Sequence, residues 1–329
     1  MRAVLCKAFG GPETLVCASV PPPAMKPDHV RVAIHAAGVN LADTLIIRGR
    51  YQDKPDFPFS PGSEVAGVVS EIGAGVSRLQ VGDRVLARTG WGGYAEEAVV
   101  PETAAVILPE AMDFITAAGF IVVYGTAIHA LADRGRLRPG ETLLVLGAAG
   151  GVGLAAVELG KALGARVIAA ASSADKLAIA KAHGADDLID YGTEDLKERV
   201  RALTGGKGAD VIYDPIGGEA TQAVMSAINW RGRLLVVGFA SGDIPKLALN
   251  RVLIKGCDVI GVYWGDHLRH DPDGLAEEMV ALSRFYAAGQ IRPHVSATYP
   301  LEAAAAALQA IENRSAVGKI VLQVREASA

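Results

Sequence analysis

A glycine-rich turn between an apolar strand and a helix constrains this chain more than any other feature. The apolar stretch Thr142–Leu146 runs into the turn at residues 147–153, and apolar side chains at helical spacing follow. A second apolar strand at residues 166–170 completes a βαβ unit. Glycines let backbone N–H groups approach a pyrophosphate, and a helix N-terminus presents unpaired donors with a partial positive charge. The unit therefore predicts a dinucleotide-binding motif, because the strand and helix supply the context that glycines alone lack.

The residues after the second strand favour NADP over NAD. NAD sites usually place an acidic residue about 20 residues after the glycines, where it accepts from the ribose 2′-OH. Residues 171–173 contain no acid, and Lys176 lies one helical turn onward. Hydroxyls and an ammonium suit a 2′-phosphate, although Ser172 or Ser173 could simply cap the next helix and Asp175 could oppose the phosphate. We expect NADPH as the cofactor.

The expected secondary structure changes in character near residue 123. Before it, short β segments separated by proline and glycine favour an antiparallel, barrel-like module. Beyond it, strands alternate with helices, which predicts a parallel, doubly wound sheet. Periodicity does not assign the C-terminal segment to either module. The expected strands are 30–36, 64–72, 84–87, 95–100, 142–146, 166–170, 187–189, 210–213, 233–239, 258–263, 294–299 and 319–324, and the expected helices are 174–183, 195–203, 219–228, 274–288 and 301–313.

Composition and charge exclude several classes of protein. A chain of 329 residues is long enough for two domains of about 150 residues each. Its net charge of −4 gives no electrostatic footprint for nucleic acid or an anionic membrane. The three cysteines have no paired spacing, and no uncharged apolar run reaches the ~20 residues that span a bilayer. The N-terminus lacks the apolar core of a signal peptide. We expect a soluble, cytoplasmic protein without nucleic-acid or membrane partners.

Several short segments occur along the chain in a specific order. They are residues 38–43, 49–51, 58–64 with 66–67, 82–85 and 92–96, then the glycine turn, residues 172–176, 190–191 and 318–319. In this order they resemble the zinc-independent quinone oxidoreductases of the medium-chain dehydrogenase/reductase superfamily, over nearly the whole chain. The resemblance implies an α/β protein with a GroES-like, β-rich catalytic domain (residues 1–123 and 266–329). A Rossmann domain with a doubly wound parallel sheet (residues 124–265) would lie between these two segments.

The positions that would bind zinc in related enzymes carry unsuitable side chains. Zinc-dependent relatives use a thiolate where Asn40 stands and an imidazole at Ser63, beside Glu64. An amide and a hydroxyl do not replace these N/S ligands. Residues 86–101, where the structural zinc lobe needs four cysteines, contain none. We expect neither zinc site.

Without a metal, hydride transfer needs an acceptor that is already electron-poor. A quinone or an α,β-unsaturated carbonyl spreads the developing charge by conjugation, so the protein mainly has to align it with the nicotinamide. The predicted activity is NADPH-dependent reduction of a quinone. Reduction of an enone or an enoyl thioester is the alternative on the same fold, and a non-catalytic NADPH-binding protein is a third hypothesis.

Three residues are candidates for the chemistry. Asn40 resembles the family's active-site asparagine, whose amide can orient the nicotinamide or the acceptor oxygen; otherwise it ties down a turn. Tyr51 lies where related reductases carry a tyrosine that can donate a proton, or it packs near a loop. Thr126 is similar to a residue that contacts the nicotinamide, or it bonds to its own helix backbone. Asp43, three residues after Asn40, could contact ligand, cap a helix or form an ion pair.

The other predicted cofactor contacts fall at the turn, at strand ends and near the C-terminus. By resemblance, residues 238–240 approach the nicotinamide, while a surface salt bridge explains the two C-terminal residues nearly as well. The full prediction is Gly150, Gly151, Val152 and Gly153 for the pyrophosphate, Ser172, Lys176 and Tyr191 for the 2′-phosphate and adenine, Gly238, Phe239 and Ala240 for the nicotinamide, Arg314 and Lys319 at the C-terminal contact, and Asn40 and Thr126 from above.

Two further patterns concern the surface. His267 and His270 could share a helical face, but their charged surroundings predict a solvated surface rather than a metal site. The strand at 258–263 is apolar, and by resemblance it pairs across a dimer. Because an exposed apolar edge invites aggregation, we expect a homodimer.

Overall fold

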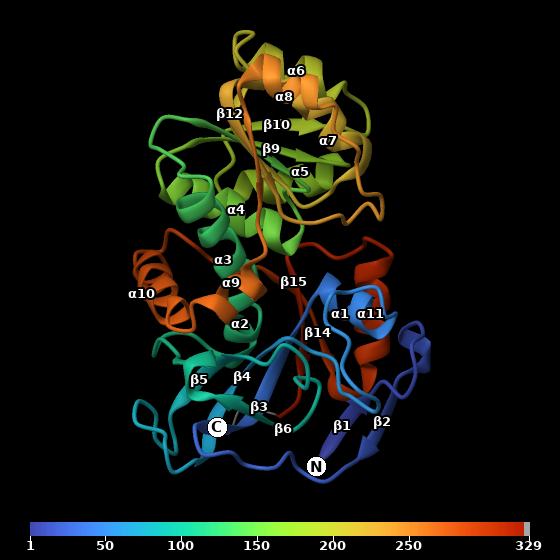
Figure 1. The fold of residues 1–329 in the computed structure, drawn as a ribbon, viewed down its shortest axis with the longest axis vertical. Coiled ribbons are helices and arrows are strands. Elements are labelled where there is room, and N and C mark those ends of the chain that lie inside the picture. The colour runs from blue at the N-terminus through green and yellow to red at the C-terminus, as the bar shows by residue number, and fades with distance from the viewer. Residues whose placement is uncertain (326–329) are drawn as a thin grey trace. The chain divides into compact units, whose positions relative to one another are not determined.

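The computed structural model describes residues 1–325, which fall into two compact units (Figure 1). Unit 1 comprises Met1–Val122, Asp271–Met279 and the chain from Pro293 onward, and unit 2 comprises Val123–His270 and Val280–Arg292. The expected catalytic domain included residues 266–329, whereas residues 266–270 and 280–292 belong to unit 2. Within unit 2, the backbone N–H of Arg292 donates to both carboxylate oxygens of buried Glu158 at 3.1 Å, which ties this segment down. No helix among the described residues is both long and apolar enough to cross a membrane.

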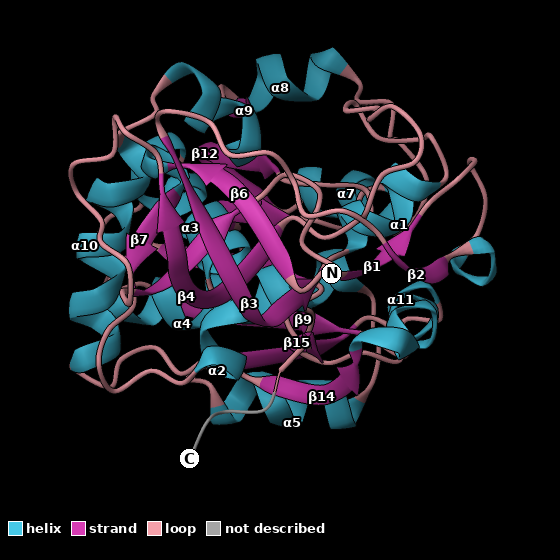
Figure 2. Cartoon of the chain, turned by 90° about the horizontal axis from the view of Figure 1, so that it is seen from below, coloured by secondary structure: helices cyan, strands magenta, loops and turns pink. Residues whose placement is uncertain are grey.

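Within residues 1–325, unit 1 is built on a seven-stranded sheet with the order β14-β15-β3-β4-β5-β7, and β6 also pairs with β3. Most of its pairs are antiparallel, and β14 and β15 lie side by side in parallel (Figure 2). The C-terminal strands therefore belong to this unit, as the resemblance implied. The elements are β1 (Arg2–Leu5), η1 (Pro12–Thr14), β2 (Val16–Ser19), β3 (His29–Val39), α1 (Leu41–Ile47), β4 (Glu64–Ile72), β5 (Arg84–Arg88), β6 (Glu97–Pro101), η2 (Glu102–Ala104), β7 (Ala105–Ile107), α2 (Phe114–Ala118), β14 (Val295–Pro300), η4 (Leu301–Ala303), α11 (Ala304–Glu312) and β15 (Lys319–Gln323).

The register between β15 and β3 positions the candidate site. Ile320 pairs with Val39, so Lys319 and Asn40 become neighbours although 279 positions separate them in the chain. Alternate side chains of β3, among them Val32 and Ile34, are fully buried in the core of the unit. A strand with one face in the core holds its register firmly, because a slip of one residue would turn that face to solvent.

Unit 2 contains, within the described residues, a six-stranded parallel sheet with the order β10-β9-β8-β11-β12-β13. Numbered from β8, this is the order 3-2-1-4-5-6 of the Rossmann fold, with its switch point beside β8. The elements are η3 (His129–Arg134), β8 (Thr142–Leu146), α4 (Gly151–Ala162), β9 (Arg166–Ala171), α5 (Ala174–Ala182), β10 (Asp187–Asp190), α6 (Leu196–Leu203), β11 (Ala209–Asp214), α7 (Gly218–Met225), β12 (Ile228–Val236), α8 (Leu249–Lys255), β13 (Asp258–Gly261) and α9 (Trp264–His270). Helices α3 (Ile121–Ile128) and α10 (Gly274–Ala287) each cross a boundary between the two units.

Some expected elements are wrong in extent. The helix expected at 219–228 ends at Met225, and Ile228 instead begins β12, because it pairs with Ala209 in the parallel register. The strand expected at 258–263 stops at Gly261, and the segment at 301–313 divides into η4 and α11. Helices α1, α2, α3, α8 and α9 did not stand out from the sequence, since most are a single turn or two and lack an amphipathic stripe.

Candidate functional site

The turn that carries Asn40 is fixed by a buried carboxylate. Asn40 is the N-cap of α1, and its backbone N–H donates to Asp43 Oδ2 at 2.8 Å. The Tyr94 hydroxyl donates to the same oxygen at 2.9 Å. Asp43 is fully buried, so of its expected alternatives the structure shows the capping role. Burial raises the pKa of Asp43 to about 6, although these hydrogen bonds and nearby Lys319 act in the opposite direction.

The side chain of Asn40 lies in a buried polar cluster, named here the Lys319 cluster: Asn40, Ser63, Glu64 and Lys319. The Lys319 ammonium donates to Val39 O at 3.0 Å, to Asn40 Oδ1 at 2.7 Å and to Glu64 Oε1 at 2.7 Å. Asn40 Nδ2 donates to Glu64 Oε1 at 2.9 Å and to Ser63 Oγ at 3.2 Å. The remaining Glu64 oxygen, Oε2, accepts from the backbone N–H of Val122 at 3.0 Å. The cluster pairs the ammonium of Lys319 with the carboxylate of Glu64 and gives both groups further hydrogen bonds, as buried ions require.

Lys319 forms an ion pair with Glu64, but this pair is not the surface salt bridge that was the alternative to a cofactor contact. The side chain is 5% exposed and that of Glu64 0%, so the ion pair is buried rather than on the surface. Arg314, the other C-terminal candidate, has φ 55° and lies in the segment between α11 and β15. Tyr51 packs against the apolar core of the unit. The described hydrogen bonds of Asn40 join it to Asp43, Ser63, Glu64 and Lys319.

In unit 2, the glycine turn has the geometry of a close backbone approach. Gly147 has φ +58°, and Gly150 is the N-cap of α4. A Cβ at Gly153 would lie 2.2 Å from Gly147 O, so glycine is required there for packing between turn and helix. A Cβ at Gly150 would meet only Gly147 O, at 3.4 Å. Open space therefore lies beside Gly150, where the first backbone N–H groups of the helix have no intrahelical acceptor.

Three predicted adenosine contacts converge at the carboxyl ends of β9 and β10. Ser173 caps α5 by accepting from Lys176 N at 3.5 Å, and the Lys176 ammonium reaches Ser172 Oγ at 3.4 Å. Asp190 pairs with Ala171 in the sheet, and Tyr191 N donates to Ala171 O at 3.0 Å. Ser172, Lys176 and Tyr191 thus lie at one corner of the sheet.

The other candidates of unit 2 lie apart from that corner. Residues 238–240 follow β12, and their backbone is held to the end of β11 by Gly238 N to Asp214 O at 3.3 Å and Ala240 N to Pro215 O at 3.0 Å. The segment lies at the carboxyl edge of the sheet, where ligands of open α/β sheets bind. Thr126 is half-buried in α3, next to Gly125, against which the Trp264 ring packs.

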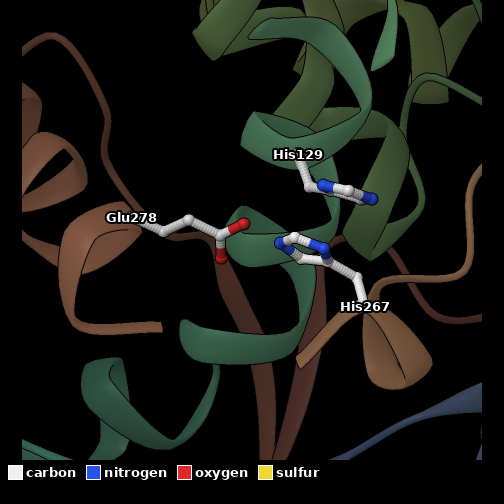
Figure 3. Close-up of side chains that lie close together, drawn as sticks. All are labelled: His129, His267 and Glu278. Atoms are coloured by element: carbon white, nitrogen blue, oxygen red, sulfur yellow. The ribbon is translucent and has the colours of Figure 1, made fainter. Parts of the chain in front are cut away.

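A histidine pair was missed by the sequence reasoning. His129 of η3 and His267 of α9 stack with ring centroids 4.2 Å apart and an interplanar angle of 16° (Figure 3). The pKa of His129 is lowered to about 4, mainly by burial and to a smaller extent by the nearby His267. This imidazole is therefore neutral near pH 7. His270 is exposed, as the charged surroundings predicted, and its Nε2 lies 3.5 Å from Asp266 Oδ2. Figure 3 also labels Glu278, from the part of α10 that belongs to unit 1.

Comparisons with known proteins agree with this architecture. Residues 26–110 match the model of the alcohol dehydrogenase GroES-like domain, and residues 151–281 match that of the zinc-binding dehydrogenase domain. A quinone oxidoreductase-like protein 2 homolog from Nematostella vectensis is 41% identical over 99% of this chain and 89% of its own. The quinone oxidoreductase of Rattus norvegicus is 34% identical over 98% of this chain and 97% of its own. The Escherichia coli quinone oxidoreductase, solved in complex with NADPH, has a TM-score of 0.92 at 31% identity and covers 98% of this chain and 100% of its own.

The chain belongs to the medium-chain dehydrogenase/reductase superfamily and, within it, to the zinc-independent quinone oxidoreductase family. The name of the second matching model refers to zinc. The donor set at the corresponding positions of this chain, an amide and a hydroxyl beside a buried ion pair, does not fit that metal.

The buried carboxyl of Asp43 predicts a pH-dependent stability. Unfolded aspartate ionises near pH 4, whereas Asp43 ionises near 6 in the folded protein. Between these values the unfolded state loses its proton while the folded state keeps it. The contribution of the Asp43 carboxyl to the free energy of unfolding is therefore fully present below about pH 4 and is lost as the pH rises through 6. Relative to Asp43→Asn, the wild type should lose about 2 to 3 kcal/mol between pH 4 and 7.

Urea unfolding of the two proteins across this pH range measures the difference. Asn at position 43 keeps an acceptor oxygen for the Asn40 N–H but cannot ionise, so its curve serves as the reference. Parallel stability curves for the two proteins would contradict the raised pKa.

Proposed function

We propose that this protein is an NADPH-dependent, zinc-free oxidoreductase that transfers a hydride to a quinone. The observation that carries the proposal is the Lys319 cluster. At the positions where zinc-dependent relatives hold a Lewis acid, this chain has an amide and a hydroxyl beside a buried ion pair. Oxidation of an alcohol through a zinc alkoxide would lack its main electrostatic support here. Hydride transfer to a conjugated, electron-poor acceptor needs far less electrostatic support.

The glycine turn fits the pyrophosphate of NADPH. The open space beside Gly150 and the free N–H groups of α4 suit an anion, and the helix dipole adds a partial positive charge. We assign Gly150, Gly151, Val152 and Gly153 to this contact. NADPH was present in the solved Escherichia coli relative, which supports the choice of cofactor.

The corner formed by Ser172, Lys176 and Tyr191 fits the adenosine end. An ammonium and a hydroxyl 3.4 Å apart offer donors to a 2′-phosphate, and β9 ends without a carboxylate that would repel it. When bound, NADPH supplies the hydride. We place its nicotinamide near residues 238–240 and Thr126, and we assign Asn40 and Tyr51 to the acceptor side by the family resemblance. Three free cysteines, two of them buried, support a cytoplasmic protein.

One contact favours a quinone over a coenzyme A thioester. A thioester of this kind would need basic side chains for its phosphates, and the first 120 residues offer Arg48, Arg50, Lys54 and Arg88. Arg48 instead forms a two-bond ion pair with Glu312, with Nε to Oε1 at 2.8 Å and Nη2 to Oε2 at 3.0 Å. A guanidinium already engaged by a carboxylate in this way has little left for a phosphate.

Steady-state oxidation of NADPH tests the activity. We expect 1,4-benzoquinone and 9,10-phenanthrenequinone to be reduced with kcat/KM at least tenfold above that of an alkenal or crotonyl-CoA, because their conjugation best spreads the developing charge. Preference for crotonyl-CoA would replace the quinone by the alternative substrate. Tight NADPH binding with no turnover of any acceptor would contradict the enzyme proposal.

The adenosine corner predicts the effect of removing one ammonium. Lys176→Ala should raise the Kd for NADPH about tenfold and leave the Kd for NADH nearly unchanged, since only NADPH carries the 2′-phosphate. Fluorescence titration measures both constants. Lys181→Ala is the matched control, because Lys181 lies on the same helix and donates to Asp186 O at 3.0 Å, away from the corner. An equal loss for both cofactors would refute the role of Lys176.

We also propose that two copies of the chain associate through the edge of the unit 2 sheet. β13 is the last strand of that sheet, so one side of its backbone has no strand partner among the described residues. Exposed apolar side chains, named here the edge patch, lie on β13 itself, on its neighbour β12 and on α8, which precedes it: Trp230, Leu249, Leu253, Ile254 and Val259, of which Leu253 is 80% and Leu249 78% exposed. A second copy could continue the sheet by an isologous contact and cover the patch.

Light scattering after size exclusion tests this association. The wild type should run as a dimer, and Val259→Lys should run as a monomer, because a charge on an edge strand opposes pairing. Val81→Lys, at an exposed apolar position of unit 1, should remain dimeric. A wild-type monomer, or a dimer that survives Val259→Lys, would exclude this interface.

A further inference from the structure

The carboxamide of Asn40 has no hydrogen left for a ligand. Its two N–H groups donate to Ser63 Oγ and Glu64 Oε1, and its oxygen accepts from the Lys319 ammonium. The orientation of the amide is unambiguous. An ammonium only donates and a carboxylate only accepts, so the atom facing Lys319 is oxygen and the atom facing Glu64 is nitrogen. Asn40 can therefore offer a ligand only a spare lone pair on Oδ1.

Lys319 likewise cannot donate directly. An ammonium has three N–H groups, and Val39 O, Asn40 Oδ1 and Glu64 Oε1 take all three. Asn40 could donate to a ligand only by breaking its bond to Ser63 or to Glu64, and Lys319 only by breaking one of its three buried bonds, and each break has a cost.

Ser63 is the member of the cluster that keeps a hydrogen. Its Oγ accepts from Asn40 Nδ2 at 3.2 Å, and within residues 1–325 its hydroxyl hydrogen has no acceptor. The side chain is half-buried, so it is neither sealed in the core nor freely solvated. A hydroxyl that accepts one hydrogen bond also becomes a better donor of the next, because hydrogen bonds in a chain polarise one another.

The backbone holds Ser63 in place on both sides. Thr89 N donates to Ser63 O at 2.9 Å, and Tyr94 N donates to Pro61 O at 2.9 Å. Gly62, with φ +96°, packs so closely that a Cβ there would lie 2.4 Å from the Tyr94 ring. A donor that needs no rearrangement when charge develops is what electrostatic stabilisation of an oxyanion requires.

We propose that Ser63, and not Asn40, is the hydrogen-bond donor to the acceptor oxygen, with Glu64 and Lys319 as positioning residues that fix the Asn40 amide behind it. This inference rests on the proposed function, since it names the group that receives the negative charge formed by hydride transfer. The hydride adds to the conjugated acceptor, the electron pair moves to the acceptor oxygen, and the Ser63 hydroxyl donates to that oxygen without giving up its proton. Solvent then protonates the oxygen.

Binding of an oxyanion tests the donor independently of turnover. The probe is 4-nitrophenolate, titrated by absorbance into the protein saturated with NADP⁺ at a pH where the phenol is ionised. Ser63→Ala should weaken its binding by about tenfold to a hundredfold, the range for a hydrogen bond to a charged group. Ser63→Thr, which keeps the hydroxyl, should recover most of the affinity. The matched control is Ser60→Ala, because the Ser60 hydroxyl is already bonded to Tyr94 O at 3.1 Å.

The double variant Glu64→Gln with Lys319→Met removes both buried charges together and tests the positioning residues. Phenolate affinity should fall at least fivefold while the Kd for NADPH stays within twofold of the wild type. A large rise in that Kd would show that Lys319 contacts the cofactor instead.

Equal phenolate binding by the wild type and Ser63→Ala, or no binding by either, would overturn the assignment of Ser63. Neither result bears on the proposed activity, which fails only if the wild type reduces no acceptor. With an active wild type, Ser63→Ala should lower kcat for the quinone and leave the Kd for NADPH unchanged.

Discussion

The ion pair between Lys319 and Glu64 is the interaction on which the rest of unit 1 depends. Both side chains are buried, so each charge is tolerable only while the other is present. The pair bridges β15 and β4, which lie on either side of β3 in the sheet, although 255 positions separate the two residues in the chain. Correct assembly of the two chain ends is therefore coupled to completion of the polar cluster.

This arrangement keeps a positive charge at the metal-free site but changes how the charge can act. A zinc ion in a catalytic site has an open position, so a substrate oxygen can bind it directly. The Lys319 ammonium has no open position, because all three of its hydrogens are bonded within the protein. Its influence must pass through the Asn40 amide, whose dipole it orients. The site that we propose therefore suits acceptors that need alignment and one hydrogen bond rather than a Lewis acid.

The sequence predicted what local patterns encode. The strands Thr142–Leu146 and Glu64–Ile72 have the predicted bounds, and the fold class and the family are confirmed. It could not reveal that Lys319 is buried beside Asn40, because no local pattern marks a contact across 279 positions. The start of β12 at Ile228 was missed for the same reason, since its pairing with Ala209 overrides a continuous helical pattern. Ser63 entered the sequence reasoning only as a missing zinc ligand.

That treatment of Ser63 shows why a substituted metal ligand should be judged by its new hydrogen bonds. Judged by type alone, Asn40 is the richer group, with two donors and an acceptor, and Ser63 is a small polar residue. In the folded chain Ser63 is the better donor to a ligand. Glu64 and Lys319 bind the amide of Asn40, whereas the hydroxyl of Ser63 keeps its hydrogen. The capacity of a polar residue to bind a ligand is what remains after its neighbours in the fold have been satisfied.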